Sequence, residues 1–410
     1  MDEEFIYLDN AATTWPKPPE VQKAVADCLV RQGANPGRSS HRMSLEAERI
    51  IEETRFLLAR FFNAPSPDHV IFTLNCTDSL NMALKGLLHP GDRVITGPYE
   101  HNSVIRPLRR LERKGVSVSV IRGTRDFCLD LAYCYQVARQ GVDLAVMSHA
   151  SNVTGCTQPV REMAEAVHEM GGVFILDAAQ TAGRVKIDME EMGIDILAAP
   201  GHKGLYGPMG TGILVLGRNI DIEPFREGGT GFRSEDEMQP LDLPWHLEAG
   251  TPNLPGIAGL RAAIRFIQKV SIEEISRKET EMARTLYEAL RGIPGVRLFC
   301  PPEGPKNGIV SFTIDGCDVS LAGTILDQVF GIGVRTGLHC APQAHKSIGT
   351  FPSGTIRASF GYFNTFEHVE RLVSAVRQIA ARSPGITSST GSSSAPLNSY
   401  NSSRLPKSTS

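Results

Sequence analysis

Two charged side chains in the middle of the chain follow strand-like segments and suggest covalent chemistry. An apolar run at 194–199 leads into Pro200-Gly201-His202-Lys203, and an earlier apolar run at 173–176 ends in Asp177. Open α/β sheets bind ligands at the carboxyl ends of their strands, where both side chains would lie. A lysine can form a Schiff base and an acid can keep a pyridine nitrogen protonated, so the pair suits pyridoxal phosphate. Each residue alone fits an ordinary surface lysine or turn acid equally well.

Further polar residues come directly after other strand-like runs. His101 follows the run at 93–96, and Asn152 follows the run at 143–148. The carboxyl ends of parallel strands meet at one edge of a sheet, so we expect these residues to converge with Asp177 and Lys203. A polar turn at 75–79 opens a helix and suits a phosphate, although an ordinary N-cap by Thr77 or Asp78 explains it too.

The elements that must position these residues alternate between strands and helices up to residue 216, which predicts a mostly parallel sheet covered on both faces. We expect strands at 5–8, 70–73, 93–96, 116–121, 143–148, 173–176, 194–199 and 211–216, and helices at 18–32, 44–62, 79–88, 103–114 and 158–170.

A second, smaller α+β domain is predicted after an irregular, Gly- and Pro-rich segment at 226–255. It comprises a helix or helix pair at 256–291, a helix at 318–330, strands at 309–314, 333–336 and 355–359, and a last helix that begins at Asn364 with Glu367 in a capping box. The expected division is 16–255 for the large domain, 1–15 with 256–382 for the small one, and a disordered Ser-rich tail at 383–410.

Composition excludes several classes of protein. The 410 residues exceed the usual size of a single core, and 41% of them are hydrophobic, as in a globular protein. A formal charge of −3 gives no reason to expect nucleic acid or membrane binding, and no apolar run approaches the roughly 20 residues of a spanning helix. The acidic start, Met1–Glu4, favours a cytoplasmic protein. The eight cysteines form no CxxC pair and no metal-like spacing, so no metal is expected.

Seven motifs, in order along the chain, carry a resemblance to a known family. They are Tyr7-Leu8-Asp9-Asn10-Ala11-Ala12, Glu100-His101-Asn102, Ser151-Asn152-Val153-Thr154-Gly155, Asp177-Ala178-Ala179-Gln180, Gly201-His202-Lys203, Glu248-Ala249-Gly250-Thr251-Pro252-Asn253 and Val334-Arg335-Thr336-Gly337-Leu338-His339-Cys340. From about Tyr7 to Arg382 the chain resembles the class V aminotransferase-fold enzymes that use pyridoxal phosphate, specifically group II cysteine desulfurases and selenocysteine lyase-like proteins. The resemblance implies fold type I of these transferases, with a seven-stranded-type sheet.

The resemblance also implies roles around the cofactor. Lys203 would hold it as a Schiff base and then move the substrate α-proton, Asp177 would pair with the ring nitrogen, and His101 would stack on the ring. The remaining contacts fall to polar groups: Gln180 and Asn152 at the phenolic oxygen, and Cys76, Thr77 and His202 at the phosphate. Thr251 would reach the phosphate of a neighbouring subunit, because family members form homodimers with shared sites.

Substrate roles follow in the same way. Arg357 would clamp the carboxylate of L-cysteine, with Asn152 beside it and Arg335 and His41 as further candidates for the wall. Cys340 would take the sulfur as a persulfide, leaving L-alanine, and then pass it to an acceptor protein. Three alternatives stay open. They are selenocysteine lyase activity, another class V reaction (transamination, epimerisation or β-elimination), and a non-catalytic partner on a retained fold.

Two departures from the family pattern indicate a divergent subfamily. Pro200 stands where many relatives have a phosphate-binding serine, and Gly204 is an extra residue between Lys203 and Leu205-Tyr206-Gly207-Pro208. The substrate and partner of the best-known family members are therefore not assigned to this chain.

Overall fold

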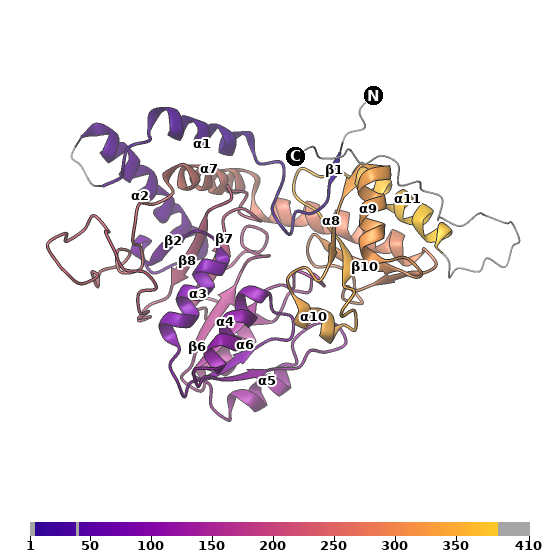
Figure 1. Ribbon diagram of the computed structural model, residues 1–410, viewed down its shortest axis with the longest axis horizontal. Helices are drawn as coiled ribbons and strands as arrows, with labels where there is room; N and C mark the ends of the chain where they lie inside the picture. Colours follow the sequence, from indigo (N-terminus) through magenta and orange to yellow (C-terminus); the bar gives the residue numbers. More distant parts are fainter. Residues whose placement is uncertain (1–4, 38–40, 384–410) are drawn as a thin grey trace, which may run out of the picture.

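The structure is a computed structural model that describes residues 5–37 and 41–383. Figure 1 shows two units side by side, a larger one built around a sheet and a smaller one containing α9, α11 and β10. Beyond residue 383, the predicted Ser-rich tail lies outside the described residues.

A seven-stranded sheet forms the centre of the larger unit. Its strands, in spatial order, are β2 (Val70–Thr73), β8 (Gly212–Leu216), β7 (Ile196–Pro200), β6 (Val173–Asp177), β5 (Leu144–Ser148), β3 (Arg93–Thr96) and β4 (Ser117–Val120). Six strands run in one direction, and β8 runs against both of its neighbours. The mostly parallel sheet predicted from the apolar runs is confirmed.

Successive residues of each strand enter opposite cores, because side chains alternate across a sheet. In β7, Ile196 and Ala198 pack on the face covered by α3 and α4, whereas Leu197 and Ala199 pack on the opposite face with α5 and α6. The helices of this unit are α1 (Pro19–Arg31), α2 (Arg42–Phe62), α3 (Cys76–Leu87), α4 (Asn102–Glu112), α5 (Leu131–Ala138), α6 (Val160–His168) and α7 (Leu254–Val270), with a 3₁₀ turn at Pro67–His69.

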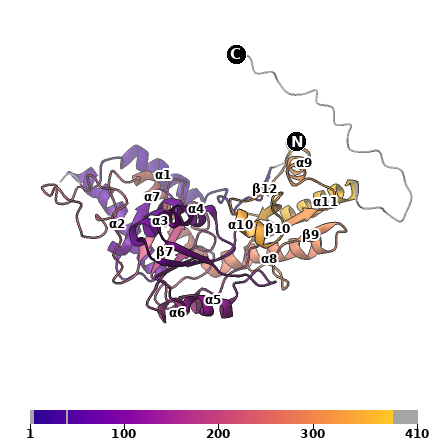
Figure 2. The ribbon, with the colours of Figure 1, turned by 60° about the horizontal axis from the view of Figure 1, so that its bottom comes forward.

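The smaller unit is an antiparallel sheet covered by helices. The sheet has the order β12 (Arg335–Gly337), β13 (Thr355–Ser359), β10 (Ile309–Ile314) and β9 (Val296–Leu298). Its helices are α8 (Ile272–Arg291), α9 (Val319–Phe330), α10 (Pro342–Ser347) and α11 (Phe366–Arg382). The N-terminal strand β1 (Ile6–Tyr7) pairs with β11 (Ile332–Gly333), so the start of the chain belongs to this unit. Figure 2 shows α8 running beneath the sheet strands β9 and β10.

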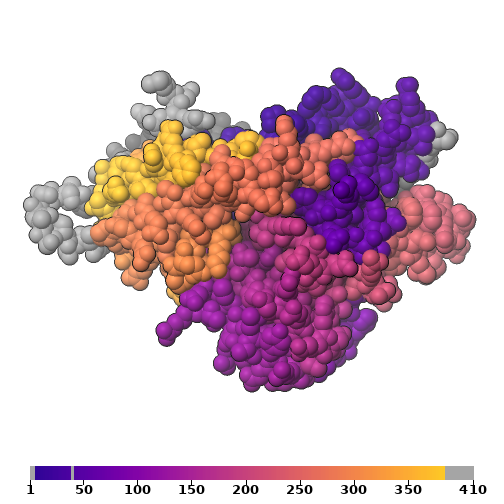
Figure 3. Space-filling view, turned by 180° about the vertical axis from the view of Figure 1, so that it is seen from behind, coloured from indigo at the N-terminus to yellow at the C-terminus, as the bar shows by residue number. Residues whose placement is uncertain are grey.

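Helix α7 packs against the larger unit, although the division expected from the sequence assigned it to the small domain. The sequence division put residues from 256 onward in the small domain, but α7 lies against α1 and α2. Its buried residues Leu260 and Ile264 belong to the core of the larger unit. The segment before it, residues 217–253, holds no helix or strand and bulges from one side of the molecule (Figure 3, rose atoms at the right).

The capping box predicted for the last helix is wrong. Helix α11 begins at Phe366, and its N-cap Thr365 makes no side-chain capping bond. The side chain of Asn364 instead accepts from Gly361 N (2.8 Å) and from Asn10 Nδ2 (3.0 Å). A tertiary contact with the N-terminal loop therefore takes the group that local reasoning assigned to the helix.

Candidate active site

A cavity of about 510 Å³ lies at the carboxyl ends of β5, β6 and β7. The strand-end residues expected to converge do so there, since His101, Asn152, Asp177 and Lys203 all line it. The other lining residues are Ala11, Ala12, Asn75, Cys76, Thr77, Ser103, Ser148, Ala150, Ala179, Gln180, Pro200, His202, Arg335, His339 and Arg357. Both units contribute, so the cavity lies at the seam between them.

Asp177 and Lys203 interact electrostatically in this cavity, and each opposes the pKa shift that burial causes in the other. Burial raises the pKa of the Asp177 carboxyl, and the Ala179 amide (2.9 Å) and Lys203 counteract this rise. Burial lowers the pKa of the Lys203 ammonium, and Asp177 opposes that change. Burial also raises the pKa of the Cys76 thiol, whose Sγ donates to Asp177 Oδ1 over 3.5 Å. The site thus keeps an acid and an amine close together at the end of neighbouring strands.

His101 is held as a neutral imidazole. It is the N-cap of α4, where its Nδ1 accepts from Ser103 N (3.1 Å). Nδ1 is therefore unprotonated, and the ring proton of the neutral form sits on Nε2. Burial, with the nearby cations Lys203, Arg335, Arg357 and Arg106 acting in the same direction, lowers the pKa of His101 to about 4. At neutral pH this side chain presents an uncharged ring with one N–H donor.

Several buried polar atoms around the cavity lack a partner. Among the described residues, Gln180 Oε1, His202 Nδ1 and Arg357 Nε are buried without a hydrogen bond. Such atoms cost free energy unless a ligand or water satisfies them. The first turn of α3 also opens here, and the amides of Cys76 and Thr77 have no acceptor within their helix. These groups form a place suited to a polar, anionic ligand.

Arg357 is fully buried on β13, opposite the strand ends of the larger unit. Its Nη2 donates to Asp9 Oδ1 (2.6 Å) and its Nη1 to the Asn152 carbonyl (3.1 Å). The Asn152 side chain donates in turn to the His339 carbonyl (2.7 Å). These bonds fix the guanidinium of Arg357, which lines the cavity, and leave its Nε without a partner among the described residues.

Cys340 is exposed, in the loop between β12 and α10. His339 and Cys340 adopt positive φ values of 48° and 58°, a conformation that costs energy for residues other than glycine and is concentrated at functional sites. Arg335 Nη2 donates to Sγ (3.2 Å), and the Cys340 carbonyl accepts from Asn102 N (2.8 Å). Cys340 lines a hollow of about 410 Å³ that shares Thr77, His101 and Ser103 with the cavity.

Two candidate residues lie elsewhere. Thr251 lines a separate hollow of about 290 Å³, and His41 is the exposed N-cap of α2, where its Nδ1 accepts from Ser44 N. Neither residue lines the cavity around Lys203 within this chain.

Sequence reasoning missed two groups that support the site. Asp9 was noticed only as part of a motif, and the structure shows it as the carboxylate that pairs with Arg357. Glu100 is buried behind Ser148, accepts from Ser148 N and Oγ, and has its pKa raised to about 7 by burial. A buried acid next to a strand end was the available signal for Glu100; nothing local pointed to the partner of Asp9.

The two departures from the family pattern lie on either side of Lys203 in the chain. Pro200 ends β7 and lines the cavity in place of a hydroxyl donor. At Gly204 an added Cβ would lie 2.4 Å from the Ala182 carbonyl oxygen, so only glycine fits this inserted position. The insertion is therefore accommodated by close contact of two backbone segments.

In the described part of the chain, no group of three or more His, Cys, Asp or Glu side chains could hold a metal ion. No helix there is long and apolar enough to cross a membrane.

Comparisons with known proteins agree with this geometry. The family described as aminotransferase class-V matches residues 6–372. A relative from Methanothermobacter thermautotrophicus named "Probable cysteine desulfurase" is 34% identical over 383 residues, covering 92% of this chain and 95% of its own. The solved apo cysteine desulfurase of Thermococcus onnurineus is 34% identical with a TM-score of 0.87, and it covers 92% of this chain and 95% of its own. The cysteine desulfurase CsdA of Escherichia coli is 29% identical with a TM-score of 0.83 and the same coverage.

Proposed function

The chain belongs to the class V aminotransferase family, and on that premise we propose that it is a cysteine desulfurase dependent on pyridoxal phosphate. It converts L-cysteine to L-alanine and takes the sulfur onto Cys340. The observation that carries the proposal is the hollow at Cys340, which adjoins the Lys203 cavity and shares three of its lining residues. An exposed thiol and a buried amine thus lie in two adjoining hollows.

The chain's own groups fit the cofactor. The free amides of α3 and the unpartnered His202 Nδ1 suit its phosphate, the Gln180 Oε1 acceptor suits a protonated phenolic oxygen, and Asp177 suits its ring nitrogen. Lys203 is the amine to which its aldehyde would attach. When bound, pyridoxal phosphate withdraws electrons from the carbon that carries the substrate amino group, which weakens the bonds to that carbon.

Arg357 and Asn152 bind and orient the substrate in this proposal. Arg357 Nε has no partner among the described residues, and its two Nη atoms are held by Asp9 and Asn152. A guanidinium fixed in this way offers a charged donor to the substrate carboxylate without further loss of side-chain freedom.

Lys203 moves protons. Burial lowers the pKa of its Nζ, which raises the share of neutral amine that can accept the α-proton at neutral pH. His101 contributes a neutral ring whose Nε2–H can donate, because Nδ1 is occupied by Ser103 N.

Cys340 supplies the nucleophile. Its Sγ attacks the sulfur of the substrate, an S–S bond forms, and the carbon–sulfur bond of L-cysteine breaks. The electrons of the broken bond stay with the substrate carbon, which gains one proton and becomes the methyl group of L-alanine. The balance is one thiol and one L-cysteine consumed, with one persulfide and one L-alanine produced.

Alanine release tests the proposal and separates it from selenocysteine lyase activity. The enzyme loaded with pyridoxal phosphate is assayed with L-cysteine and with L-selenocysteine, as wild type, Cys340→Ala and Cys317→Ala. Cys317 is the matched control because it is a partly exposed thiol on the far side of the smaller unit. We expect Cys340→Ala alone to lose the L-cysteine reaction. Unchanged alanine from both substrates would remove Cys340 from the mechanism, and no alanine from either would favour another class V reaction.

A homodimer would account for Thr251 and His41. Both side chains are exposed and lie outside the cavity of their own chain, as expected for residues that complete a neighbour's site. A mixture of Lys203→Ala and Thr251→Ala chains tests this. In a shared-site dimer, one of the two sites in a mixed pair carries both changes and the other carries neither, so mixing restores activity. No recovery in mixed dimers of verified composition would contradict a shared site.

The hollow at Cys340 would suit an acceptor protein with an acidic surface. Lys85, Arg106 and Arg110 are exposed around it. Opposite charges speed association in a way that salt suppresses, so sulfur transfer to such an acceptor should slow as ionic strength rises.

A cytoplasmic location remains a prediction from composition.

A further inference from the structure

Two thiols outside the active site lie against each other. The Sγ atoms of Cys128 and Cys156 are 3.0 Å apart, although the residues are separated by 28 positions in the chain. Both thiols are free, and neither lines the cavity around Lys203 or the hollow at Cys340. The proposed function leaves this pair unexplained.

The backbone holds both cysteines in place. Cys128 lies on a small hairpin closed by a bridge between Gly123 and Leu129, and its carbonyl accepts from Thr124 N (2.8 Å). Cys156 lies in a tight loop after β5, where its carbonyl accepts from Ser151 N (3.0 Å). The contact between the sulfur atoms therefore arises from two ordered segments.

The two thiols differ in access to solvent. Cys156 is fully buried, whereas Cys128 is half-buried on a hairpin whose residues 122–126 are exposed. Burial raises the pKa of the Cys156 thiol, and its hydrogen bond with Cys128 acts in the same direction. The ammonium of Lys306, from the loop after β9, interacts with both sulfur atoms. A small oxidant would meet Cys128 first, and Cys156 would be the thiol behind it.

We propose that Cys128 and Cys156 form a redox-modification site that closes to an intramolecular disulfide, with a peroxide as the oxidant. Cys128 Sγ attacks one peroxide oxygen, the O–O bond breaks, and water leaves with the thiol proton, which gives a sulfenic acid. Cys156 Sγ then attacks that sulfur, the S–O bond breaks, and a second water leaves. The two thiols lose two electrons and two protons in total, and hydrogen peroxide becomes two water molecules.

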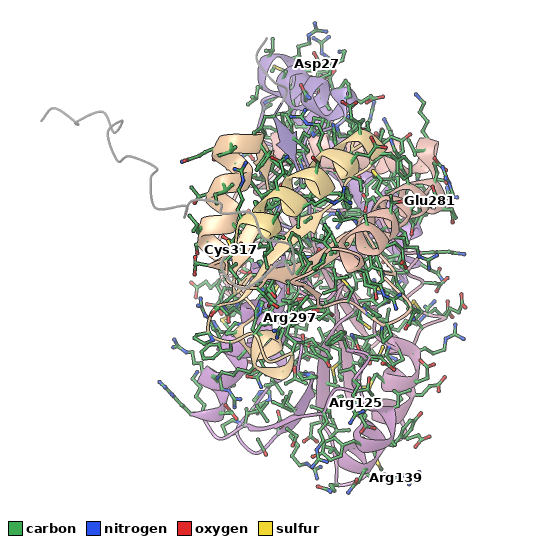
Figure 4. The ribbon with its side chains drawn as sticks, turned by 90° about the vertical axis from the view of Figure 1, so that its right-hand side faces the viewer. Asp27, Arg125, Arg139, Glu281, Arg297 and Cys317 are labelled. Atoms are coloured by element: carbon green, nitrogen blue, oxygen red, sulfur yellow. The ribbon has the colours of Figure 1, made fainter. Side chains whose placement is uncertain are left out.

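The disulfide would join the exposed hairpin to the loop behind the active site. In that loop the Asn152 carbonyl accepts from Arg357, and the Val153 carbonyl accepts from Ser311 Oγ (2.5 Å). The bridge would form outside the cavity, so it fastens the hairpin without occupying the space around Lys203. Trypsin cleavage after Arg125, an exposed residue of this hairpin (Figure 4), should then become slower.

Peptide mapping tests the site directly. The full-length protein is treated with hydrogen peroxide, blocked with iodoacetamide and digested with trypsin without reduction. Cleavage after Arg125, Arg139 and Arg161 yields the peptides 126–139 and 140–161, which should be recovered joined and two hydrogen atoms lighter. Reduction with dithiothreitol should separate them. The first peptide also contains Cys134, so fragmentation assigns the bridge.

Variants and an unfolded control make the result decisive. Cys128→Ser and Cys156→Ser should each abolish the joined peptide, while Cys134→Ser and Cys317→Ser should keep it. The bridge should form about tenfold or more faster in folded protein than in urea, because the fold holds the thiols together. Equal rates in urea would overturn the proposal. Recovery of Cys128 as a sulfinic acid, or unchanged, in correctly folded protein would overturn it as well.

Discussion

Two buried groups at the seam between the units differ in how their charges are paired. In the seam cluster, Arg184, Glu279 and Tyr206, the opposite charges pair with each other, although Arg184 Nη2 has no hydrogen-bond partner among the described residues. Arg184 Nε lies 2.7 Å from Glu279 Oε2, and Tyr206 Oη donates to Glu279 Oε1 over 2.9 Å. The pocket cluster, Lys203, Asp177 and Arg357, surrounds a cavity. Within the described residues, Lys203 forms no ion pair and Arg357 Nε has no partner.

The difference separates structural charge from functional charge. A buried ion pair such as Arg184–Glu279 neutralises its own charges and by itself shows little about activity. Buried groups that remain unsatisfied around a cavity lower stability, so they persist where a ligand or a reaction uses them. Burial lowers the pKa of Lys203 and raises the pKa of Asp177, as in sites tuned for proton transfer. The two clusters should therefore respond oppositely to substitution.

Lys203→Ala should have the largest effect on activity. Removing the amine removes both cofactor attachment and proton transfer, so kcat for alanine release should fall on the order of 10⁴-fold. The free energy of unfolding should not fall, because the substitution removes a buried amine that has no ion-pair partner among the described residues. Kinetic assays and thermal denaturation of the same preparations check both expectations. A variant that unfolds more easily yet keeps activity within tenfold would reverse the assignment of the two clusters.

Glu279→Gln should have the opposite profile. It leaves Arg184 buried without its counter-charge, which typically lowers the free energy of unfolding by about 3–5 kcal/mol. Activity per folded molecule should stay close to that of the wild type, because Glu279 does not line the cavity. Urea denaturation gives the stability, and replacing both partners with apolar residues (Arg184→Met with Glu279→Leu) is the control. The double variant should be less destabilised than the single one; equal or greater loss would show that the pair itself stabilises the fold.

His149 is a buried histidine that stays neutral at neutral pH, unlike the charged groups of the two clusters. It is 3% exposed, and burial lowers its pKa to about 4. The pKa of this histidine is higher in the unfolded chain, so the unfolded state binds the proton more readily. The contribution of His149 to the free energy of unfolding is therefore fully present above about pH 6.5 and is lost as the pH falls towards 4. His149→Gln should remove up to about 3 kcal/mol of that acid sensitivity, measured by urea denaturation at several pH values. His89→Gln, at an exposed histidine, is the control and should leave the pH profile unchanged.

Asp177→Asn should have the smallest of these effects and should act on the cofactor. The amide keeps the size of the side chain but removes the negative charge opposite the ring nitrogen, so kcat should fall on the order of 10²-fold. The fold should be retained, because burial already disfavours the charged carboxylate. The visible absorption of the bound cofactor and its titration with pH provide a readout besides activity. Wild-type spectra and rates would show that Asp177 has no electrostatic role.

The fold could largely be predicted because buried parallel strands are continuous apolar runs. Strand β7 is one such run, and its end marked the position of Lys203. Helix α5 was missed because residues 131–138 lack a clear polar face, and β9 because it has three residues of mixed burial. Helix α10 was missed because it has only six residues.

Local sequence patterns predicted the site where strand ends and the polar turn at 75–79 marked it. His101, Asn152, Asp177 and Lys203 follow strands that the sheet brings to one edge. The pairing of Asp9 with Arg357 joins residues 348 positions apart, and no local pattern encodes it. The roles given to these residues rest on chemistry and resemblance, and they remain predictions.

The central claim is that sulfur leaves L-cysteine at the Lys203 cavity and arrives on Cys340. The most direct measurement is mass mapping of the full-length enzyme, loaded with pyridoxal phosphate, after one turnover with L-cysteine under non-reducing conditions. The account predicts one added sulfur atom on the tryptic peptide 336–346, which contains Cys340, and none on the peptides containing Cys76 or Cys128. Alanine formed with the added sulfur on another cysteine, or on none, would contradict it.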